Sequence, residues 1–507
     1  MAWISRETLG EPGHLTQTGQ VDSPRSIGAR ALAGLLPDLS HLPGPRYRSL
    51  STAVATLLLD GRVAPGVRLP SERDLAAVLQ LSRSTATAAY QQLTEDGLLE
   101  RRRGSGSYLR LPAGSRVSGP GGRLNRQDDG VTVLDLSVAA MPTMLGPLQD
   151  AATRALGQLG QHTGDIGYQP YGIGSLRERV ARRFTDRGVP TEADQILVTN
   201  GAQHAMDLLL RLHVNAGDRV LTELPSYPGA LDAIRAYGGR IVAVPFGADG
   251  SWDGAALRNA LLQASPRLAF LIPDFHNPTG VLIGTDQRRE LLAAARRAGT
   301  TVIVDESFID LDLRPAGGEN DQPLPMAAID DSVVSIGSLS KAFWGGLRIG
   351  WIRADRDSVT RLAMIRARSD MGGSVLEQLV ADEVLIELEP IAARRRKELI
   401  GKRDTLLSEL AARLPAWRPS YPAGGLSTWV KLDAPGATPL THLLEQRGLL
   451  LTPGSRFAVD GTLERYLRIP FALPAADLVT AVERMAVAWA DLGPRQLRRP
   501  SAALVPA

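Results

Sequence analysis

The chain has 507 residues, a length that predicts about three structural units. Its composition, 44% hydrophobic and 22% charged, is that of a globular protein, and a net charge of +3 does not by itself predict nucleic-acid binding. The chain has no cysteine, which excludes disulfides and thiolate metal sites, and we expect no metal centre. Because it shows neither a secretory signal pattern nor a long apolar run, we expect no membrane span and a cytoplasmic location.

The N-terminal quarter is predicted to hold an arm, a short helix, a compact helical unit and a linker. Residues 1–26 are polar and rich in Gly, Ser and Thr, so we expect a disordered arm. Residues 27–45 carry a short amphipathic helix that leads into the compact unit, 46–111. The stretch 112–130 mixes Gly, Pro, Ser and charges with almost no large apolar residue, which is typical of a linker.

The compact unit reads as two short helices followed by a hairpin. The first helix begins near Ser71, and Ser82 can cap a second helix whose apolar side is formed by Ala86, Ala89, Tyr90 and Leu93. The opposite side carries small hydroxyls and one arginine: Arg83, Ser84, Thr85 and Thr87. Such a helix suits the DNA major groove, where its N–H groups and hydroxyls face phosphates and the arginine reaches a guanine edge.

The hairpin adds positive charge to this unit. The stretch "DGLLERRRGSGSYL" predicts two strands around a glycine turn with three consecutive arginines. Residues 45–112 contain ten arginines and six acids, so this part alone carries more excess charge than the whole chain. A helical accessory domain with a solvated basic face is the alternative, but the order helix, turn, helix, hairpin argues against it.

The segment "GRVAPGVRLPSERDLAAVLQLSRSTATAAYQQLTEDGLLERRRGSGSYL" resembles the GntR-type winged helix-turn-helix nearly end to end. The resemblance implies contacts to double-stranded DNA by Arg73, Ser82, Arg83, Ser84, Thr85 and Thr87, with wing contacts near Arg103 to Gly106. Thr87 stands where some members carry a second arginine, so a different base preference is expected.

From residue 131 onward, short apolar strands alternate with helices. The predicted strands are "QILVTN", "DRVLTEL", "RIVAVPF", "LAFLIPD", "TVIVDES" and "SVVSIGS". Fully apolar short strands separated by helices predict an α/β unit with a mostly parallel sheet covered on both faces. We expect a large part at about 131–375, a small α+β part at about 376–490, and an unstructured tail at 491–507.

Three residues near the ends of these strands suit a phosphorylated pyridine aldehyde. Lys341 supplies an amine that can form a Schiff base, and a pocket that disfavours its charge makes it nucleophilic. Asp305, at the end of "VIVDES", is placed to pair with a protonated ring nitrogen, and Asn277 in "PDFHNPTG" can donate to a ring hydroxyl. Each residue alone has an ordinary structural explanation, as a surface lysine, a cap or a turn.

The remaining residues suit the phosphate and the ring of the same molecule. "TNGAQHAMDLLL" reads as strand, glycine turn and helix, so the N–H groups of Ala202 and Gln203 can hold a phosphate. Ser338 and the permanent cation Arg348 are expected to bind the same phosphate, and Tyr227 in "ELPSYPGA" can stack on the ring. It is the combination in this chain order that makes a purely structural explanation improbable.

These residues in this order resemble the class I/II aminotransferases, which are fold type I enzymes that use pyridoxal 5'-phosphate (PLP). The resemblance covers about 131–490 and implies that Lys341 forms the Schiff base with PLP. The implied PLP-binding residues are Ala202, Gln203, Tyr227, Asn277, Asp305, Ser338, Lys341 and Arg348. Arg468 in "YLRIPFA" matches the arginine that binds a substrate carboxylate.

Three further positions bear on this resemblance. Tyr168 matches a tyrosine that reaches the phosphate of the neighbouring subunit, although Tyr171 is an alternative. Phe308 stands where the family usually has a tyrosine that donates to the ring hydroxyl, which is expected to slow catalysis without preventing binding. His276 is expected to serve packing.

A GntR-type unit joined by a linker to an aminotransferase-like domain resembles the MocR-type regulators. The resemblance implies a PLP-dependent transcriptional regulator that forms a head-to-tail homodimer and binds operator DNA. It senses PLP or an amino-compound effector through an internal aldimine, with the effector's acid group on Arg468. The alternative is an aminotransferase tethered by its N-terminal unit, which Phe308 disfavours, and a third possibility is a cofactor-free scaffold.

Overall fold

The computed structural model describes residues 26–37, 39, 45–59, 63, 66–102, 105–110, 133–164, 166–247, 251–315, 322–459 and 462–497. The chain divides into two compact units, Met1–Val117 and Ser118–Ala507. The predicted arm up to residue 25 and the predicted linker lie outside the described residues, as does Arg103. Within the described residues, no helix combines the length and apolarity that a membrane crossing requires.

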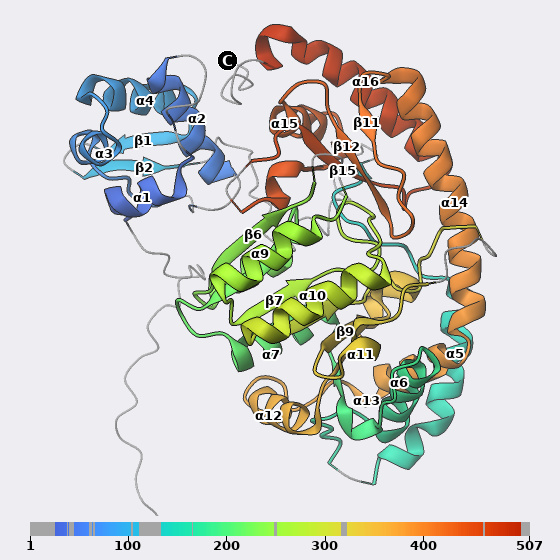
Figure 1. Ribbon diagram of the computed structural model, residues 1–507. Coiled ribbons are helices and arrows are strands. Elements are labelled where there is room, and N and C mark those ends of the chain that lie inside the picture. Colours follow the sequence, from blue (N-terminus) through green and yellow to red (C-terminus); the bar gives the residue numbers. More distant parts are fainter. Residues whose placement is uncertain are drawn as a thin grey trace, which may run out of the picture. The chain divides into compact units, whose positions relative to one another are not determined.

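The described residues of the first unit form helices α1 to α4 and a hairpin of strands β1 and β2 (Figure 1). In chain order these are α1 (Ala29–Leu35), α2 (Arg46–Leu59), α3 (Glu72–Leu79), α4 (Arg83–Glu95), β1 (Leu99–Arg102) and β2 (Gly106–Leu109). The Ser71 hydroxyl caps α3 by accepting the N–H of Asp74 at 3.1 Å, and Ser82 caps α4 by accepting that of Thr85 at 3.0 Å. The predicted helices, caps and hairpin are therefore present.

The core of this unit is the apolar side predicted for α4. Ala86, Ala89, Tyr90 and Leu93 are fully buried, and the Tyr90 hydroxyl donates to the carbonyl of Pro70 at 2.8 Å. Leu32 on α1 is also fully buried in this core. The helix that precedes residue 46 is consequently part of the unit.

Replacing Leu32 by alanine should destabilise the first unit by about 2–5 kcal/mol, because a buried leucine would leave a cavity. Denaturant-dependent amide exchange in peptides of α2 and α4 measures this loss in the full chain. Arg30→Ala, an exposed change two residues earlier on the same helix, is the control and should leave exchange unchanged. Equal stability of Leu32→Ala and wild type would show that α1 does not support this core.

The second unit is built on a seven-stranded sheet of order β4-β10-β9-β8-β7-β5-β6. The strands are β4 (Ile196–Thr199), β5 (Arg219–Leu224), β6 (Arg240–Pro245), β7 (Leu268–Leu271), β8 (Thr301–Asp305), β9 (Val334–Ser338) and β10 (Gly350–Arg353). All six predicted strands are confirmed, and the sheet is mostly parallel as expected. The strand that was not predicted, β10, runs antiparallel to both β4 and β9.

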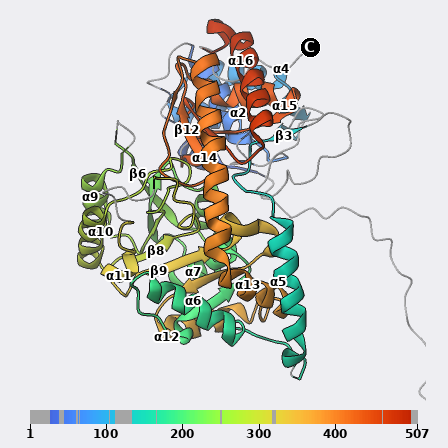
Figure 2. The same ribbon diagram turned by 90° about the vertical axis from the view of Figure 1, so that its right-hand side faces the viewer.

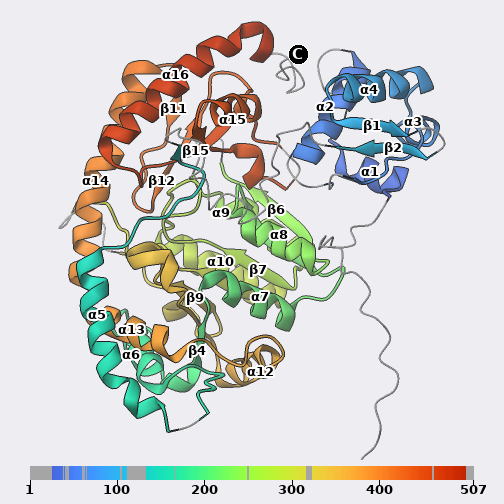
Figure 3. The same ribbon diagram turned by 180° about the vertical axis from the view of Figure 1, so that it is seen from behind.

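Helices cover both faces of this sheet (Figure 1, Figure 3). One face packs α5 (Leu145–Gln158), α6 (Gly174–Asp186), α9 (Gly254–Ala264), α10 (Thr285–Ala298) and α13 (Val375–Ile386). The other face packs α7 (Ala202–His213), α8 (Pro228–Ala236) and α12 (Arg356–Arg366). The short helix α11 (Met326–Ile329) precedes β9. Successive residues of β8 point into opposite cores, Ile303 into one and Val304 into the other.

The long helix α14 (Leu388–Arg413) leads from the large part to a smaller α+β part (Figure 2). The sheet of this smaller part has the strand order β11-β12-β15-β14. Its strands are β11 (Arg418–Pro419), β12 (Ser427–Lys431), β14 (Thr452–Pro453) and β15 (Tyr466–Pro470). Two helices accompany them, α15 (Ala437–Gln446) and α16 (Ala475–Leu497). β3 (Leu134–Asp135) pairs in parallel with β13 (Leu449–Leu450), which places the start of the unit beside its late part.

The predicted start of the C-terminal tail at residue 491 is wrong. Helix α16 continues to Leu497, and Leu492 is only 1% exposed because it packs in the core of the small part. This buried leucine makes continuation of the helix favourable past the predicted boundary. Residues 498–507 lie outside the described residues.

Candidate functional site

The predicted site residues of the larger unit follow the ends of its central strands. Asp305 is the last residue of β8, and Lys341 lies three residues after β9 on a π-helical turn, Ser340–Trp344. Asn277 follows β7, and Tyr227 follows β5. Because the carboxyl ends of parallel strands meet at one edge, the topology brings these side chains together.

The surroundings of Lys341 disfavour the charged form of its amine. Its Nζ donates to the carbonyl of Ala139 at 2.8 Å and lies 5.5 Å from the centre of the Phe308 ring. Burial lowers the pKa of Lys341 to about 8, the positive charge of Arg468 contributes to this lowering, and Asp305 acts in the opposite direction. A substantial fraction of this amine is therefore neutral near physiological pH.

Asp305 and Tyr227 share the electrostatic environment of this amine. Burial raises the pKa of Asp305, while the N–H of Ser307, which donates to it at 2.9 Å, and the charge of Lys341 oppose the rise. Burial and then Asp305 raise the pKa of Tyr227, whereas Arg468 and Arg348 lower it. The mutual influence of these groups shows that one site contains both an acidic and several basic side chains.

The turn between β4 and α7 is where the sequence predicts a phosphate site. Gly201 has a φ of +86°, and a Cβ atom there would lie 2.7 Å from Nη2 of Arg348. Arg348 donates through this nitrogen to the carbonyl of Asn200 at 2.6 Å, so its guanidinium lies at the start of α7. The first-turn N–H groups of Ala202 and Gln203 have no acceptor within the helix, and they and Arg348 suit a phosphate.

Two buried polar atoms of the site lack a partner among the described residues. These are Oδ1 of Asn277 and Nε of Arg468. The Arg468 guanidinium lies 5.1 Å from the Phe457 ring, and its Nη2 donates to the carbonyl of Ser137. Burial lowers the pKa of Arg468 to about 10. A buried polar atom without a hydrogen-bond partner costs free energy. We therefore expect these two atoms to find their partners in a bound polar ligand.

Three other predicted positions have distinct surroundings. The Ser338 hydroxyl is engaged within its own turn, with the Ser340 hydroxyl at 2.8 Å and the Ile349 carbonyl at 3.3 Å. Tyr168 is 58% exposed, whereas Tyr171 packs against the sheet core with Arg177 5.4 Å from its ring. The buried His276 packs against Phe246, with ring centres 4.8 Å apart.

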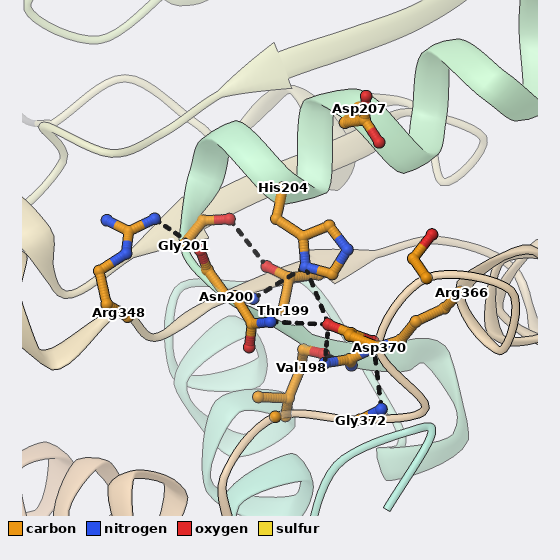
Figure 4. A network of polar contacts seen from close by, with 12 residues as sticks. Val198, Thr199, Asn200, Gly201, His204, Asp207, Arg348, Arg366, Asp370 and Gly372 are labelled. Atoms are coloured by element: carbon orange, nitrogen blue, oxygen red, sulfur yellow. Dashed lines mark hydrogen bonds and ion pairs between the residues drawn. The ribbon is translucent and has the colours of Figure 1, made fainter. Parts of the chain in front are cut away.

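A polar network around the turn between β4 and α7 was not predicted from the sequence (Figure 4). Asp370 accepts from Nε of the fully buried Arg366 at 2.7 Å and from the side-chain amide of Asn200 at 2.6 Å. The Asn200 N–H donates to Nδ1 of His204 at 3.1 Å. The network fixes Asn200, whose carbonyl accepts the hydrogen bond from Arg348. Because Asn200 and Asp370 are 170 residues apart, no local pattern could have revealed their contact.

In the smaller unit, residues predicted to contact DNA, on α4 and at the start of α3, are open to solvent. Arg73, Arg83, Ser84 and Thr87 are exposed, and the hydroxyl of Ser82 contacts those of Ser84 and Thr85 at 2.8 and 2.7 Å. On the hairpin, Gly106 has a φ of +112° and approaches the side chain of Arg68.

Two hairpin arginines already have partners within this unit. Arg101 forms an ion pair with Glu72 at 3.3 Å, and Arg102 pairs with Glu100 at 3.2 Å while lying over the Tyr108 ring. Both pairs are solvent-accessible and therefore weak, so they leave the arginines available to phosphates.

Comparison with known proteins identifies the class. The family model for aminotransferase class I and II matches residues 131–485, and the chain belongs to this family. The model for bacterial regulatory proteins of the gntR family matches residues 46–109. A GntR unit followed by an aminotransferase unit is the MocR-type architecture, as predicted.

Individual relatives are consistent with both units. The chain is 29% identical over 473 residues to the uncharacterized HTH-type transcriptional regulator YisV of Bacillus subtilis, covering 87% of this chain and 95% of that protein. It is 30% identical over 330 residues to the 2-aminoadipate transaminase of Thermus thermophilus, covering 64% and 80%. The crystal structure of LysN, an alpha-aminoadipate aminotransferase from the same species complexed with N-(5'-phosphopyridoxyl)-L-leucine, matches with a TM-score of 0.65 and 28% identity, covering 71% of this chain and 93% of that one.

Proposed function

We propose that the chain is a PLP-dependent transcriptional regulator that binds operator DNA through its GntR unit and an amine or amino acid through its aminotransferase unit. The observation that carries this proposal is the grouping of Lys341, Asp305 and Arg348 at one sheet edge in a chain with an exposed DNA-reading helix. Relatives covering most of the chain are named as HTH-type transcriptional regulators, which supports the assignment.

The residues of the site fit PLP. The unpartnered Asn277 Oδ1 can accept a hydrogen bond from a polar ring substituent, and Arg348 beside the Gly201 turn offers a cation to a phosphate. When bound, PLP condenses reversibly with primary amines, which is the chemistry that allows a lysine and an amine effector to exchange.

Each side chain has an expected role around this cofactor. Ala202, Gln203, Ser338 and Arg348 would hold the phosphate. Asp305 would keep a proton on the ring nitrogen, Asn277 would contact the ring hydroxyl, and Tyr227 would stack on the ring. Lys341 would carry the cofactor covalently, and Arg468 would bind the effector carboxylate. Tyr168, whose exposed ring is available to a second subunit, would complete the phosphate site in a head-to-tail homodimer.

The experiment that tests this function combines DNA affinity with turnover. The PLP-loaded chain is titrated with a panel of amino acids and amines, while operator binding and steady-state transamination are measured in parallel. A regulator should show a changed DNA affinity or footprint with at least one amine and little turnover. Efficient transamination with no change in DNA binding would instead support the tethered aminotransferase. Phe308, which brings no hydroxyl to the site, favours the regulator.

The rate of PLP uptake should rise about tenfold per pH unit below pH 8 and level off above it. Burial lowers the pKa of Lys341 to about 8, so protonation removes the nucleophilic amine as the pH falls through this value. Rapid-mixing absorbance between pH 6 and pH 10 measures the profile. A rate that keeps rising to about pH 10, the pKa of an ordinary lysine, would contradict the lowered pKa.

A further inference from the structure

Three backbone carbonyls of one short segment accept hydrogen bonds from three cationic side chains. In the segment Ser137–Pro142, the Ser137 carbonyl accepts from Arg468, and the Ala139 carbonyl accepts from Lys341 at 2.8 Å. The Pro142 carbonyl accepts from Nη2 of Arg395 at 2.5 Å. Two of these three cations, Lys341 and Arg468, are the groups expected to bind ligand, so the segment contacts the same side chains that a ligand would use.

Arg395 has no role in the proposed function, yet it is 2% exposed on α14. Its Nη2 donates to Phe343 at 2.9 Å as well as to Pro142, and the nearest carboxylate, Glu398, is 3.9 Å away. Its Nε is buried without a partner among the described residues. A buried cation held mainly by carbonyls is destabilising compared with an apolar side chain of similar size. Arg395 nevertheless links three parts of the unit. It lies on α14, it donates to the turn that carries Lys341, and it donates to the Ser137–Pro142 segment.

The segment also lies next to the connection with the DNA-binding unit in the sequence. It directly follows β3, whose Leu134 N–H donates to the carbonyl of Gly448, and the N–H of the adjoining Leu136 donates to that of Leu450, both at 2.9 Å. β3 is the first described element after residues 111–132, which join the two units. Side-chain hydrogen bonds from Thr452 and Arg468 join the segment to β14 and β15, whereas the chain itself joins it to β3. Loosening of the segment would therefore reach β3 along the backbone.

We infer that Arg395 is a positioning residue that anchors the Ser137–Pro142 segment, and that ligand occupancy at Lys341 and Arg468 releases this segment. The inference rests on the proposed function. A lysine nitrogen that carries the cofactor has fewer N–H groups than a free ammonium, which weakens its contact with Ala139. An effector carboxylate held by two parallel N–H groups uses Nη2 of Arg468, the nitrogen that donates to Ser137. Occupancy therefore competes with two of the three cationic contacts, while the Arg395 contact remains.

Hydrogen–deuterium exchange of the full chain tests this release. The amides of Leu134 and Leu136 report on β3, and they are measured without ligand, with PLP, and with PLP plus each amino acid of a panel. We expect exchange to rise about three- to tenfold with PLP, and further with an amino acid that binds, because each step weakens a hydrogen bond that holds the segment. Unchanged exchange in a chain whose absorbance shows bound PLP would overturn the inference while leaving the proposed function intact. A chain that takes up no PLP would overturn the proposed function itself.

Arg395→Met tests the anchor, with Arg394→Met as the matched control at the exposed neighbouring position of the same helix. We expect Arg395→Met to exchange faster at Leu134 and Leu136 without ligand and to lose most of the response to PLP, whereas Arg394→Met should behave as wild type. If Arg395→Met does not fold, Lys341→Ala removes only the Ala139 contact and should also raise exchange in the ligand-free chain. Slow exchange in either folded variant, equal to that of wild type, would contradict the anchoring role.

Discussion

Replacing Lys341 by alanine is expected to weaken PLP retention at least about a hundredfold, about 2.8 kcal/mol, and to abolish the visible absorbance of the loaded chain. The amine of Lys341 lies with Asp305, Arg348 and Arg468 at one site, and its lowered pKa suits the proposed role of nucleophile. The remaining phosphate contacts would leave only weak, reversible binding. Gel filtration followed by absorbance measures what is retained.

The chain offers good controls for this prediction because it contains only four lysines, at positions 341, 397, 402 and 431. Lys397 and Lys431 are exposed, so Lys397→Ala and Lys431→Ala each remove one positive charge with less disturbance of packing than Lys341→Ala causes. Both variants should retain PLP as wild type does. Retention of PLP by Lys341→Ala would show that the covalent attachment lies elsewhere.

The second large effect is expected at α4, the helix predicted to read DNA. Arg83→Ala should weaken specific operator binding by about 1–3 kcal/mol, roughly 5- to 150-fold in Kd, if its guanidinium makes two hydrogen bonds to a guanine edge. Arg83 is exposed at the first turn of α4, next to the Ser82 cap that fixes the helix start. Electrophoretic or fluorescence titration against operator and random duplexes measures both affinities.

Arg30→Ala, an exposed arginine on α1, controls for the loss of one positive charge. It should weaken binding to both duplexes slightly and equally. If Arg83→Ala weakened operator and random DNA to the same degree, Arg83 would contact a phosphate and carry no base preference.

The sheet of the larger unit was predictable because its parallel strands are short, apolar and bounded by polar residues. The strand β10 was not predicted because it begins at Gly350 and ends at Arg353, which leaves only a very short apolar run between them. Arg353 is nevertheless only 2% exposed, since it donates to the carbonyls of Asp331 at 2.8 Å and Val333 at 3.2 Å. A buried charge satisfied by distant carbonyls cannot be distinguished from a surface charge in the sequence.

The same reason explains which parts of the site could be predicted. Lys341, Asp305 and Asn277 stand beside strands and turns whose local pattern is visible, so their convergence follows from the topology. Asp370 and Arg395 act through contacts across 170 and 253 residues. Arg395 lies in the run "ARRRKE", which has the composition of a solvated helix, and only the packed structure shows that this arginine faces inward.

Borohydride reduction of the PLP-loaded wild-type chain, followed by peptide mapping, tests the central claim most directly. Reduction fixes the cofactor to the nitrogen that holds it, and the four lysines fall at distinguishable positions. We predict that the peptide with Lys341, and no other, gains the mass of the cofactor less one water plus two hydrogens. Addition at position 397, 402 or 431, or no addition after incubation with excess PLP, would contradict the account.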